Sequence, residues 1–342
     1  MKKPPVIRCG IIGYGYWGPN LVRIINALPN AEISIICDSD PDRLKVAGSR
    51  FSDVTLTADA NSVLGNCDTE AIFIATPVSQ HYTLALNALR EGKHVFVEKP
   101  LASTSQEAEQ LVEEADKRGL VLMVNHVFVF SSAVQKIKVL LDKDHLGKLL
   151  YYDSVRVNLG IFRSDVNVVW DLAVHDLSIM DFLLNKSPSS ISATVVSHFD
   201  GYLENVAYLT CFFEDNLIAH INVNWLAPVK IRRALIGGIN KMIVYDELEP
   251  DQKVKIFDKG VDLTPSNDGR MNMQLNYRAG DIWTPVIANN EALEVAIMHF
   301  LSCVHDGTRP LTDGLAGLRI IRILEAADRS ARKSGQSVQI DS

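Results

Sequence analysis

The sequence predicts an α/β protein in two parts: a doubly wound parallel sheet, then an α+β domain built on a large, mostly antiparallel open sheet. In the first third of the chain, short apolar strands alternate with helical stretches, the order that produces a parallel sheet. From residue 149 onward, strand-like segments follow one another, many of them joined by hairpin-like turns. We expect the first domain to span residues 1–126 and the second to span residues 127–342.

Apolar runs and capping residues define the elements of the first part. Asp40 followed by Pro41 is typical of a helix start. Ser103 and Gln106 have the spacing of a capping box. The predicted strands are 6–12, 33–37, 71–75, 95–97 and 121–124; the predicted helices are 19–28, a segment from Asp40, 81–90 and a segment ending near Arg118.

The second part changes from alternating to consecutive strands. A helix over 133–141 leads into it, one helix over 171–184 interrupts it, and helices over 291–305 and 314–334 close the chain. Residues 262–285 show no clear periodicity, so we expect a long ordered loop there. The predicted strands are 149–158, 190–197, 205–213, 216–225, 231–236, 242–245 and 254–257.

Composition limits the class of protein. The 342 residues carry a net charge of −7, which argues against a general nucleic-acid binder. The N-terminus has no signal-peptide core, and no apolar run approaches membrane-spanning length. The five scattered cysteines lack the spacing of zinc or redox pairs. We therefore expect a cytoplasmic protein with reduced thiols, no metal and no membrane partner.

A glycine-rich turn follows the first strand and opens a helix. Gly13, Gly15 and Gly18 have the spacing of a dinucleotide-binding (Rossmann) fingerprint, with Tyr16 and Trp17 between them. Gly13 permits the tight turn, Gly15 lets the backbone approach a pyrophosphate, and Gly18 lets the helix pack closely on the strand. The alternative is an unrelated glycine-rich turn, which the strand–turn–helix context disfavours.

Asp38, at the end of the second strand, favours NAD over NADP. A carboxylate about 20 residues beyond the glycine turn accepts hydrogen bonds from the adenosine ribose. Ser39 and Asp40 follow it, so a 2′-phosphate would meet repulsion. Arg43 lies one helical turn further on and is within reach of a phosphate, which keeps NADP as the less favoured cofactor. Asp38 acting only as a helix-cap or turn residue is the alternative.

Two further strand ends carry polar motifs. Thr76-Pro77 ends the strand 71–75, and the pattern continues to His81. Glu98-Lys99-Pro100 directly follows the apolar run 95–97. A lysine at the end of a buried strand can be desolvated enough to act as an acid or base near neutral pH. Alone, Lys99 is equally compatible with a solvated turn residue.

Asp171 and His175 are four residues apart, so a helix places them on one side. An imidazole can transfer a proton, and a nearby carboxylate can orient it. The alternative for such a pair is a packed core histidine with its partner. Asp176 and Asp181 lie on other faces, and we expect them to be cap, surface or interface carboxylates.

Taken together, these motifs resemble the Gfo/Idh/MocA oxidoreductases over essentially the whole chain. The resemblance implies NAD(P)-linked oxidation or reduction at a sugar or cyclitol carbinol. It assigns proton transfer to Lys99, with Asp171 and His175 as the catalytic pair, and implies a cis bond before Pro100. The residues that it assigns to the cofactor are Gly13, Gly15, Tyr16, Trp17, Gly18, Asp38, Arg43, Thr76, Pro77, His81, Glu98 and Lys99. Glu98 is expected to point away from the lysine ammonium.

Residues 15–20, 158–160 and 167–171 look like a bacterial subgroup of sugar-nucleotide dehydrogenases in surface-polysaccharide pathways. This implies a substrate such as a UDP-N-acetylhexosamine or its uronate, oxidised at C3. The segment 128–132 departs from many relatives, which carry arginine and proline there, so substrate contacts from it are in doubt. Alternatives are an inositol or free-sugar dehydrogenase, a non-catalytic NAD-binding sensor and NAD-assisted glycoside cleavage.

Substrate contacts beyond Lys99 and His175 are inferred from proximity to Asp171: Arg163, Asn167 and Trp170. Arg156, Arg232 and Arg233 are other candidates for binding an anionic substrate, or else surface charges or subunit contacts. The segment 217–225 alternates apolar and polar residues, so one sheet face needs covering by helices and the other by a partner subunit. We expect a homodimer or homotetramer.

Overall fold

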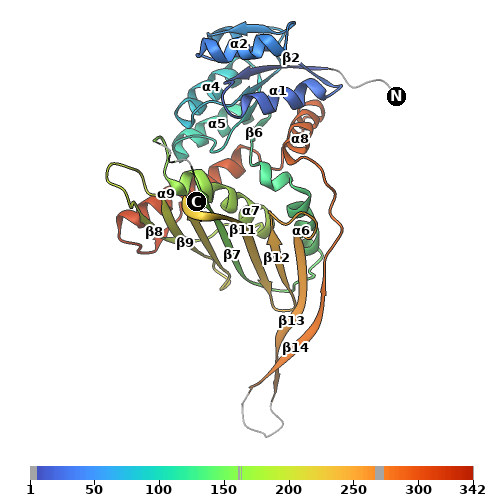
Figure 1. Cartoon of the computed structure of the whole chain (residues 1–342), viewed down its shortest axis with the longest axis vertical. Helices are drawn as coiled ribbons and strands as arrows, with labels where there is room; N and C mark the ends of the chain where they lie inside the picture. Colours follow the sequence, from blue (N-terminus) through green and yellow to red (C-terminus); the bar gives the residue numbers. More distant parts are fainter. Residues whose placement is uncertain (1–5, 161, 163, 266–272, 342) are drawn as a thin grey trace. The chain divides into compact units, whose positions relative to one another are not determined.

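The computed structural model describes residues 6–160, 162, 164–265 and 273–341 (Figure 1). The chain forms two compact units. The first spans Met1–Phe130 and Asn290–Arg322, and the second spans Ser131–Asn289 and Ile323–Ser342. Residues 290–322 thus pack with the N-terminal part of the chain. The domain limits expected from the sequence, 1–126 and 127–342, remain a prediction.

The first unit contains the predicted doubly wound parallel sheet. Its six strands are all parallel, in the order β3-β2-β1-β4-β5-β6. The strands are β1 (Ile7–Ile12), β2 (Ala31–Cys37), β3 (Thr55–Thr57), β4 (Ala71–Ile74), β5 (His94–Val97) and β6 (Leu122–Val124). The helices are α1 (Gly18–Ala27), α2 (Pro41–Arg50), α3 (Ala60–Leu64), α4 (Val78–Arg90), α5 (Ser105–Arg118), the 3₁₀ turn η1 (Val127–Phe130), α8 (Ala292–Asp306) and the start of α9 (Gly314–Arg332).

The strand register brings five chain segments to one edge of this sheet. Ile12 pairs with both Cys37 and Ile74, and Val97 pairs with Ile74 and Val124, so five strands end at the same level. The residues that follow these strand ends are therefore neighbours on the carboxyl edge: Gly13, Asp38, Ala75, Glu98 and Asn125. This edge is where doubly wound folds bind ligands.

An aromatic cluster ties α8 to the sheet. Phe73 of β4 and Phe96 of β5 are fully buried, with ring centroids 5.0 Å apart. Phe300 of α8 lies 5.3 Å from Phe73 and 5.5 Å from Phe96, edge-on to each. Because edge-to-face contact adds to the gain from burial, this packing explains why 290–322 belongs to the first unit.

Helix caps confirm one sequence expectation and correct another. The Asp40 carboxylate accepts a hydrogen bond from the Asp42 N–H, with Pro41 opening the helix as predicted. The predicted box at Ser103 and Gln106 is wrong by one residue: Thr104 is the cap, and its hydroxyl accepts from the Glu107 N–H. Glu107 is the residue that reaches back, accepting from the Ser103 N–H.

The second unit contains the predicted large, mostly antiparallel sheet, in the order β14-β13-β12-β11-β7-β10-β9-β8-β15. The β7–β10 pair alone is parallel among its described pairings. The strands are β7 (Leu149–Leu159), β8 (Ser190–Val196), β9 (Val206–Phe212), β10 (Ile218–Asn224), β11 (Leu226–Gly238), β12 (Met242–Asp246), β13 (Val254–Pro265), β14 (Met273–Trp283) and β15 (Val338–Gln339). The helical elements are α6 (Ser132–Asp142), the π turn η2 (Val169–Ala173), α7 (Val174–Leu184) and the end of α9.

The predicted alternation along β10 is confirmed. Ala219, Ile221 and Val223 are fully buried, whereas Ile218 on the opposite face is 41% exposed. The buried face packs against the helical side of the unit, where η2 contacts β10 and α7 contacts β7. Tyr208 on the neighbouring strand is also exposed on the opposite face.

The expectation of a long loop over 262–285 is wrong for its described residues. β13 and β14 form an antiparallel hairpin that runs past the other strands of its sheet (Figure 1). Val261 and Tyr277 pair across it, yet they are 42% and 86% exposed. Ile282 and Trp283 are adjacent and so point to opposite faces, yet they are 52% and 37% exposed. With neither of these faces buried, this part of the ribbon shows none of the alternation that identifies a strand.

Two expectations from the sequence concerned the state of the cysteines and membrane-spanning segments. All five cysteines are free; four are buried and Cys67 is exposed. Within the described ranges, no helix is both long and apolar enough to cross a membrane.

Candidate active site

The glycine turn of the first unit has the geometry that a bound pyrophosphate requires. Gly13 has φ of +99°, and a Cβ on it would lie 2.5 Å from the Ala75 carbonyl oxygen. A Cβ on Gly18 would lie 2.3 Å from the Gly13 carbonyl oxygen. At Gly15 a Cβ would meet only the end of the flexible Arg43 side chain, at 3.4 Å. Two glycines thus fix the turn, and the third leaves open space beside the start of α1.

Asp38 is held in place by this same turn. Its carboxylate is buried and accepts hydrogen bonds from the Tyr14 N–H at 2.6 Å and the Asp40 N–H at 2.9 Å. Arg43 lies 3.5 Å from that carboxylate and 3.4 Å from the carboxylate of Asp40. Arg43 is thus engaged with two carboxylates, and half of its side chain is exposed.

A groove of about 560 Å³ connects these residues. Gly13, Gly15, Asp38 and Arg43 line one part of it, and the turn after β4 lines another. Thr76, in that turn, has a buried hydroxyl with no hydrogen-bond partner among the described residues. A backbone cradle, a buried carboxylate that could accept hydrogen bonds from a ribose and an unsatisfied hydroxyl along one groove fit a dinucleotide. Its lining includes these cofactor-site predictions: Gly13, Gly15, Asp38, Arg43, Thr76 and Pro77.

His81, also predicted to bind the cofactor, joins two turns instead of lining the groove. Its ring nitrogens lie 2.8 Å from the Pro100 carbonyl oxygen and 2.9 Å from the Thr76 carbonyl oxygen. The ring is buried, and burial lowers its pKa. Tyr16 and Trp17 stand in the glycine turn, where Tyr16 is 85% exposed. The geometry thus places His81 in support of the site.

Lys99 follows β5 at the carboxyl edge and is half-buried, and the Lys99–Pro100 peptide bond is cis, as the resemblance implies. The carboxylate of Glu98 accepts a hydrogen bond of 2.6 Å from the Asn125 amide. Burial raises the pKa of Glu98 to about 7, although Asn125 and the Lys99 ammonium both oppose the rise. Glu98 is therefore bound by Asn125, while the charge of Lys99 still acts on it.

Asn125 and His126 were not identified from the sequence. His126 is buried, and within the described part of the chain neither of its ring nitrogens has a hydrogen-bond partner. Burial, reinforced by the Lys99 ammonium, lowers the pKa of His126 to about 3, so its ring is neutral. The signal was present in the sequence, because a polar pair directly follows the apolar run 121–124.

Asp171 belongs to the second unit and lies in the π turn η2, not in the α-helix expected over 171–184. The expected helix begins at Val174, where α7 starts. The Asp171 carboxylate accepts a hydrogen bond of 3.2 Å from the indole N–H of the buried Trp225. A Cβ on Gly160 would lie 2.7 Å from that indole, so glycine leaves the ring its space. π turns are often found at functional sites.

Asn167 and Trp170 have structural partners. The Asn167 side-chain oxygen accepts from the Val169 and Trp170 N–H groups, and its amide donates to Glu204. The Trp170 indole N–H donates to Asp328 at 2.9 Å. These contacts fix the start of η2. Arg163, the third substrate contact inferred from proximity, lies outside the described residues.

Metal ligands form no cluster in the part of the chain that the structure describes. No three His, Cys, Asp or Glu side chains there are arranged to hold an ion.

Replacing Glu98 with glutamine should change how stability depends on pH. The folded-state pKa of Glu98 is raised from 4.5 to about 7, so ionising it destabilises the fold as the pH rises through that window. Between pH 5 and pH 8, the free energy of unfolding of E98Q should rise relative to wild type by roughly 2 kcal/mol. Urea unfolding at both pH values measures this. The exposed E91Q is the control and should show no such change; equal behaviour of E98Q would contradict the assignment.

The comparisons with known proteins agree with this geometry. Residues 7–126 match the oxidoreductase family with an NAD-binding Rossmann fold, Gfo/Idh/MocA, and residues 134–244 match the Gfo/Idh/MocA C-terminal domain. D-apiose dehydrogenase of Paraburkholderia graminis is 26% identical, with 97% of this chain and 89% of that protein covered. UDP-N-acetylglucosamine 3-dehydrogenase of Acidithiobacillus ferrooxidans is 24% identical, covering 92% of this chain and 94% of that protein.

A solved structure extends the match to the whole fold. The crystal structure of a putative oxidoreductase from Magnetospirillum magnetotacticum is 30% identical and has a TM-score of 0.79. The alignment covers 94% of this chain and 99% of that one. Because the two family models together match more than half of the chain, it belongs to the NAD-binding oxidoreductases of the Gfo/Idh/MocA family.

Proposed function

We propose that this oxidoreductase transfers a hydride between NAD and a carbinol or ketone carbon of a sugar nucleotide, such as C3 of a UDP-N-acetylhexosamine or its uronate. The similarity to a UDP-N-acetylglucosamine 3-dehydrogenase over nine-tenths of both chains supports this substrate class. The same proposal places the reaction in polysaccharide biosynthesis.

Lys99, His175 and Asp171 carry the chemistry in this proposal. In the groove lined by Gly13, Gly15 and Asp38, bound NAD would supply the acceptor for the hydride of the oxidised carbon. The substrate hydroxyl hydrogen-bonds to Lys99 and His175, and the Lys99 amine accepts the hydroxyl proton. Asp171, fixed by the Trp225 indole, keeps its carboxylate beside the start of the helix that carries His175.

The ionisable groups around Lys99 are the main support for this proposal. Burial shifts the pKa values of three groups around it toward their neutral forms, and the Lys99 charge adds to the shift of two of them and opposes the third: His81, His126 and Glu98, respectively. Base catalysis requires Lys99 to release its proton, which the positive charge of a bound oxidised nicotinamide would favour. A protein that only bound NAD would need neither this setting nor the Asp171–His175 pair, which disfavours a sensor.

Substrate binding rests on fewer groups than the sequence suggested. The polar atoms of Asn167 and Trp170 are engaged with Glu204, the start of η2 and Asp328, so the proposal assigns these two residues no hydrogen bond to the substrate. An inositol or free-sugar dehydrogenase is the second candidate, supported by the similarity to D-apiose dehydrogenase. NAD-assisted glycoside cleavage would be recognised by its products.

A nucleotide-sugar dehydrogenase should reveal itself in a substrate screen. With NAD present, UDP-N-acetylhexosamines and their uronates should raise the melting temperature and produce NADH absorbance, whereas inositols and free pentoses should do neither. Thermal shift and absorbance at fixed NAD measure both. Turnover of inositols or pentoses alone would overturn the nucleotide-sugar assignment, and tight NAD binding without any turnover would favour the sensor.

Lys99→Ala should separate cofactor binding from chemistry. Removing the proton acceptor should lower turnover of UDP-N-acetylglucosamine by about 10²- to 10⁴-fold. The dissociation constant for NADH, measured by fluorescence, should stay within about twofold, because the groove residues are unchanged. The exposed Lys117→Ala is the control. Wild-type turnover in K99A, or loss of NADH binding alone, would refute the role of Lys99.

The enzyme is proposed to be a cytoplasmic homodimer or homotetramer. Its cysteines are free thiols, as expected in a reducing compartment. Tyr208, Phe212 and Ile218 are exposed on the face of the large sheet opposite its helices, where a second copy would remove them from water. Light scattering should give at least twice the chain mass of 37.9 kDa, and a compact monomer would exclude the assembly.

A further inference from the structure

A buried guanidinium connects β7 to the helix that carries His175. Arg156 lies near the end of β7, and its side chain is only 3% exposed. Its Nε donates to an Asp176 carboxylate oxygen at 2.6 Å, and its Nη1 donates to a Glu247 carboxylate oxygen at 3.3 Å. Asp176 directly follows His175 in α7. The ion pair therefore joins the sheet to the residue next to the proposed catalytic imidazole.

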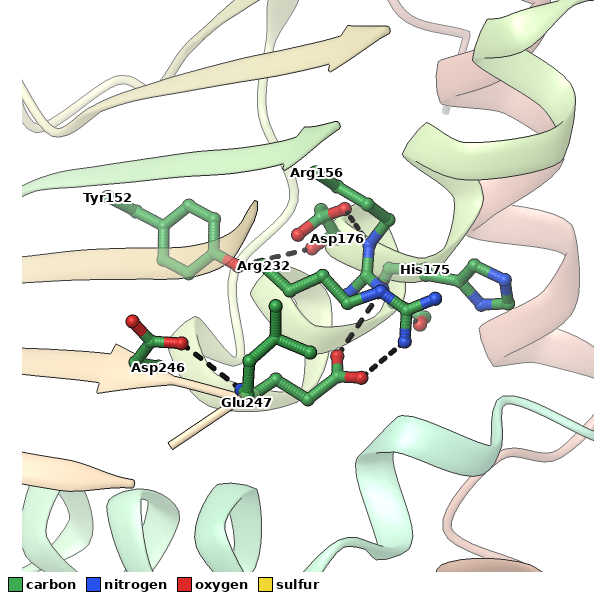
Figure 2. Close-up of polar contacts among 9 residues, drawn as sticks. Tyr152, Arg156, His175, Asp176, Arg232, Asp246 and Glu247 are labelled. Atoms are coloured by element: carbon green, nitrogen blue, oxygen red, sulfur yellow. Dashed lines mark hydrogen bonds and ion pairs between the residues drawn. The ribbon is translucent and has the colours of Figure 1, made fainter. Parts of the chain in front are cut away.

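A second arginine completes a neutral group of four, the Arg156 cluster: Arg156, Asp176, Glu247 and Arg232. Arg232 of β11 donates to the other oxygen of the Glu247 carboxylate (Figure 2). Asp176 contacts Arg156, Arg156 contacts Glu247, and Glu247 contacts Arg232, so each carboxylate lies against at least one arginine. Burial alone would lower the pKa of Arg156, but Asp176 and Glu247 outweigh it, so the guanidinium stays charged.

The helix side of the cluster is fixed by more than the ion pair. Tyr152 lies four residues before Arg156 in β7, on the same face of the strand. Its hydroxyl is 3.5 Å from the Asp176 carbonyl oxygen, so β7 approaches both the side chain and the backbone of that residue. Figure 2 shows the Asp176 carboxylate pointing toward the strands and the His175 ring pointing away from them.

A buried ion pair contributes little to stability, because desolvating both charges offsets most of their attraction. Apolar residues of the same volume would hold a helix against a sheet at least as well. What hydrogen-bonded charges add is a fixed distance and direction, as the paired contacts to Glu247 do for Arg156. The cluster is therefore better suited to setting the rotation of α7 than to strengthening its packing.

We propose that the Arg156 cluster positions His175: by fixing the carboxylate and backbone of Asp176 against β7, it sets the direction in which the imidazole leaves α7. These four side chains are positioning residues, with no assigned contact to substrate or cofactor. The inference rests on the proposed function only in taking His175 as a catalytic residue.

The test follows the His175 ring directly by NMR, with ¹³C-labelled histidine and the resonance assigned by His175→Gln. Glu247→Gln is the decisive variant, because Glu247 binds Arg156 and is distant from His175 in sequence. Asp246→Asn is the matched control: it makes the same change of charge one residue earlier and removes a carboxylate partner of another β11 arginine, the exposed Arg233.

E247Q should shift the His175 resonance more than that of any other histidine, and D246N should leave it in place. Asp176→Asn should shift it further, and the double variant should shift it by less than the sum, since both act through Arg156. Arg156→Lys, which keeps the charge, should lie nearer to wild type than Arg156→Met. If D176N fails to fold, E247Q alone decides.

An unchanged His175 resonance in folded E247Q would overturn the proposal, even if its melting temperature fell, because that result describes a stabilising role alone. An equal shift in D246N would overturn it as well. Circular dichroism checks that each variant is folded, because the cluster lies in the second unit. No substrate is needed, so failure of the nucleotide-sugar assignment would appear in the substrate screen and leave this result unaffected.

Discussion

The guanidinium of Arg156 is the charge on which the geometry of the second unit depends. An unpaired charge in that position would cost several kcal/mol in desolvation, so the chain has to bring carboxylates to it from two other elements. One comes from α7 and the other follows β12. The strand order places β7 beside β11, whose Arg232 holds the second carboxylate. Through Arg156, the helix carrying His175 is thus connected to β7, to the residue after β12 and, by way of that residue, to β11.

At the carboxyl edge of the first unit, burial changes the protonation of ionisable groups instead of bringing opposite charges together. There the groups near Lys99 are buried without full compensation, and they respond by shifting toward neutral forms: Glu98 by holding a proton to higher pH, His126 by losing one. The charges of the Arg156 cluster are paired, whereas the buried groups around the proposed proton acceptor Lys99 shift toward their neutral forms. The difference arises from burial: a charge that cannot find a partner changes its protonation state instead.

Local signals in the sequence were sufficient for most of the first unit. Alternating strands and helices, the glycine turn and the cap at Asp40 depend on neighbours within a few residues, and the structure contains all three. The capping box was misplaced by one residue because Ser103 and Thr104 both satisfy the pattern. The part of the β13–β14 hairpin beyond Phe257 was missed because none of its side chains described over 258–261 and 277–283 is buried, so no alternation marks it.

What the sequence could not supply is pairing between distant residues. Arg156 was a candidate for substrate, surface or subunit contacts; that its partners are Asp176 and Glu247 depends on how β7, α7 and the residue after β12 meet. The π turn was likewise hidden, since a spacing of four between Asp171 and His175 suits an α-helix as well as a wider turn.

His175 lies between two residues that are fixed from different strands. Asp171, four positions before it, is bound by Trp225 at the end of β10, and Asp176, one position after it, is bound by Arg156 of β7. A rotation of the helix that relieved one contact would stretch the other, because β7 and β10 are adjacent, parallel and hydrogen-bonded to each other. In the proposed arrangement, the spacing of these two strands sets the orientation of the imidazole. A sheet holds that spacing more rigidly than a loop, and the hydrogen bond proposed between His175 and the substrate hydroxyl would require such rigidity.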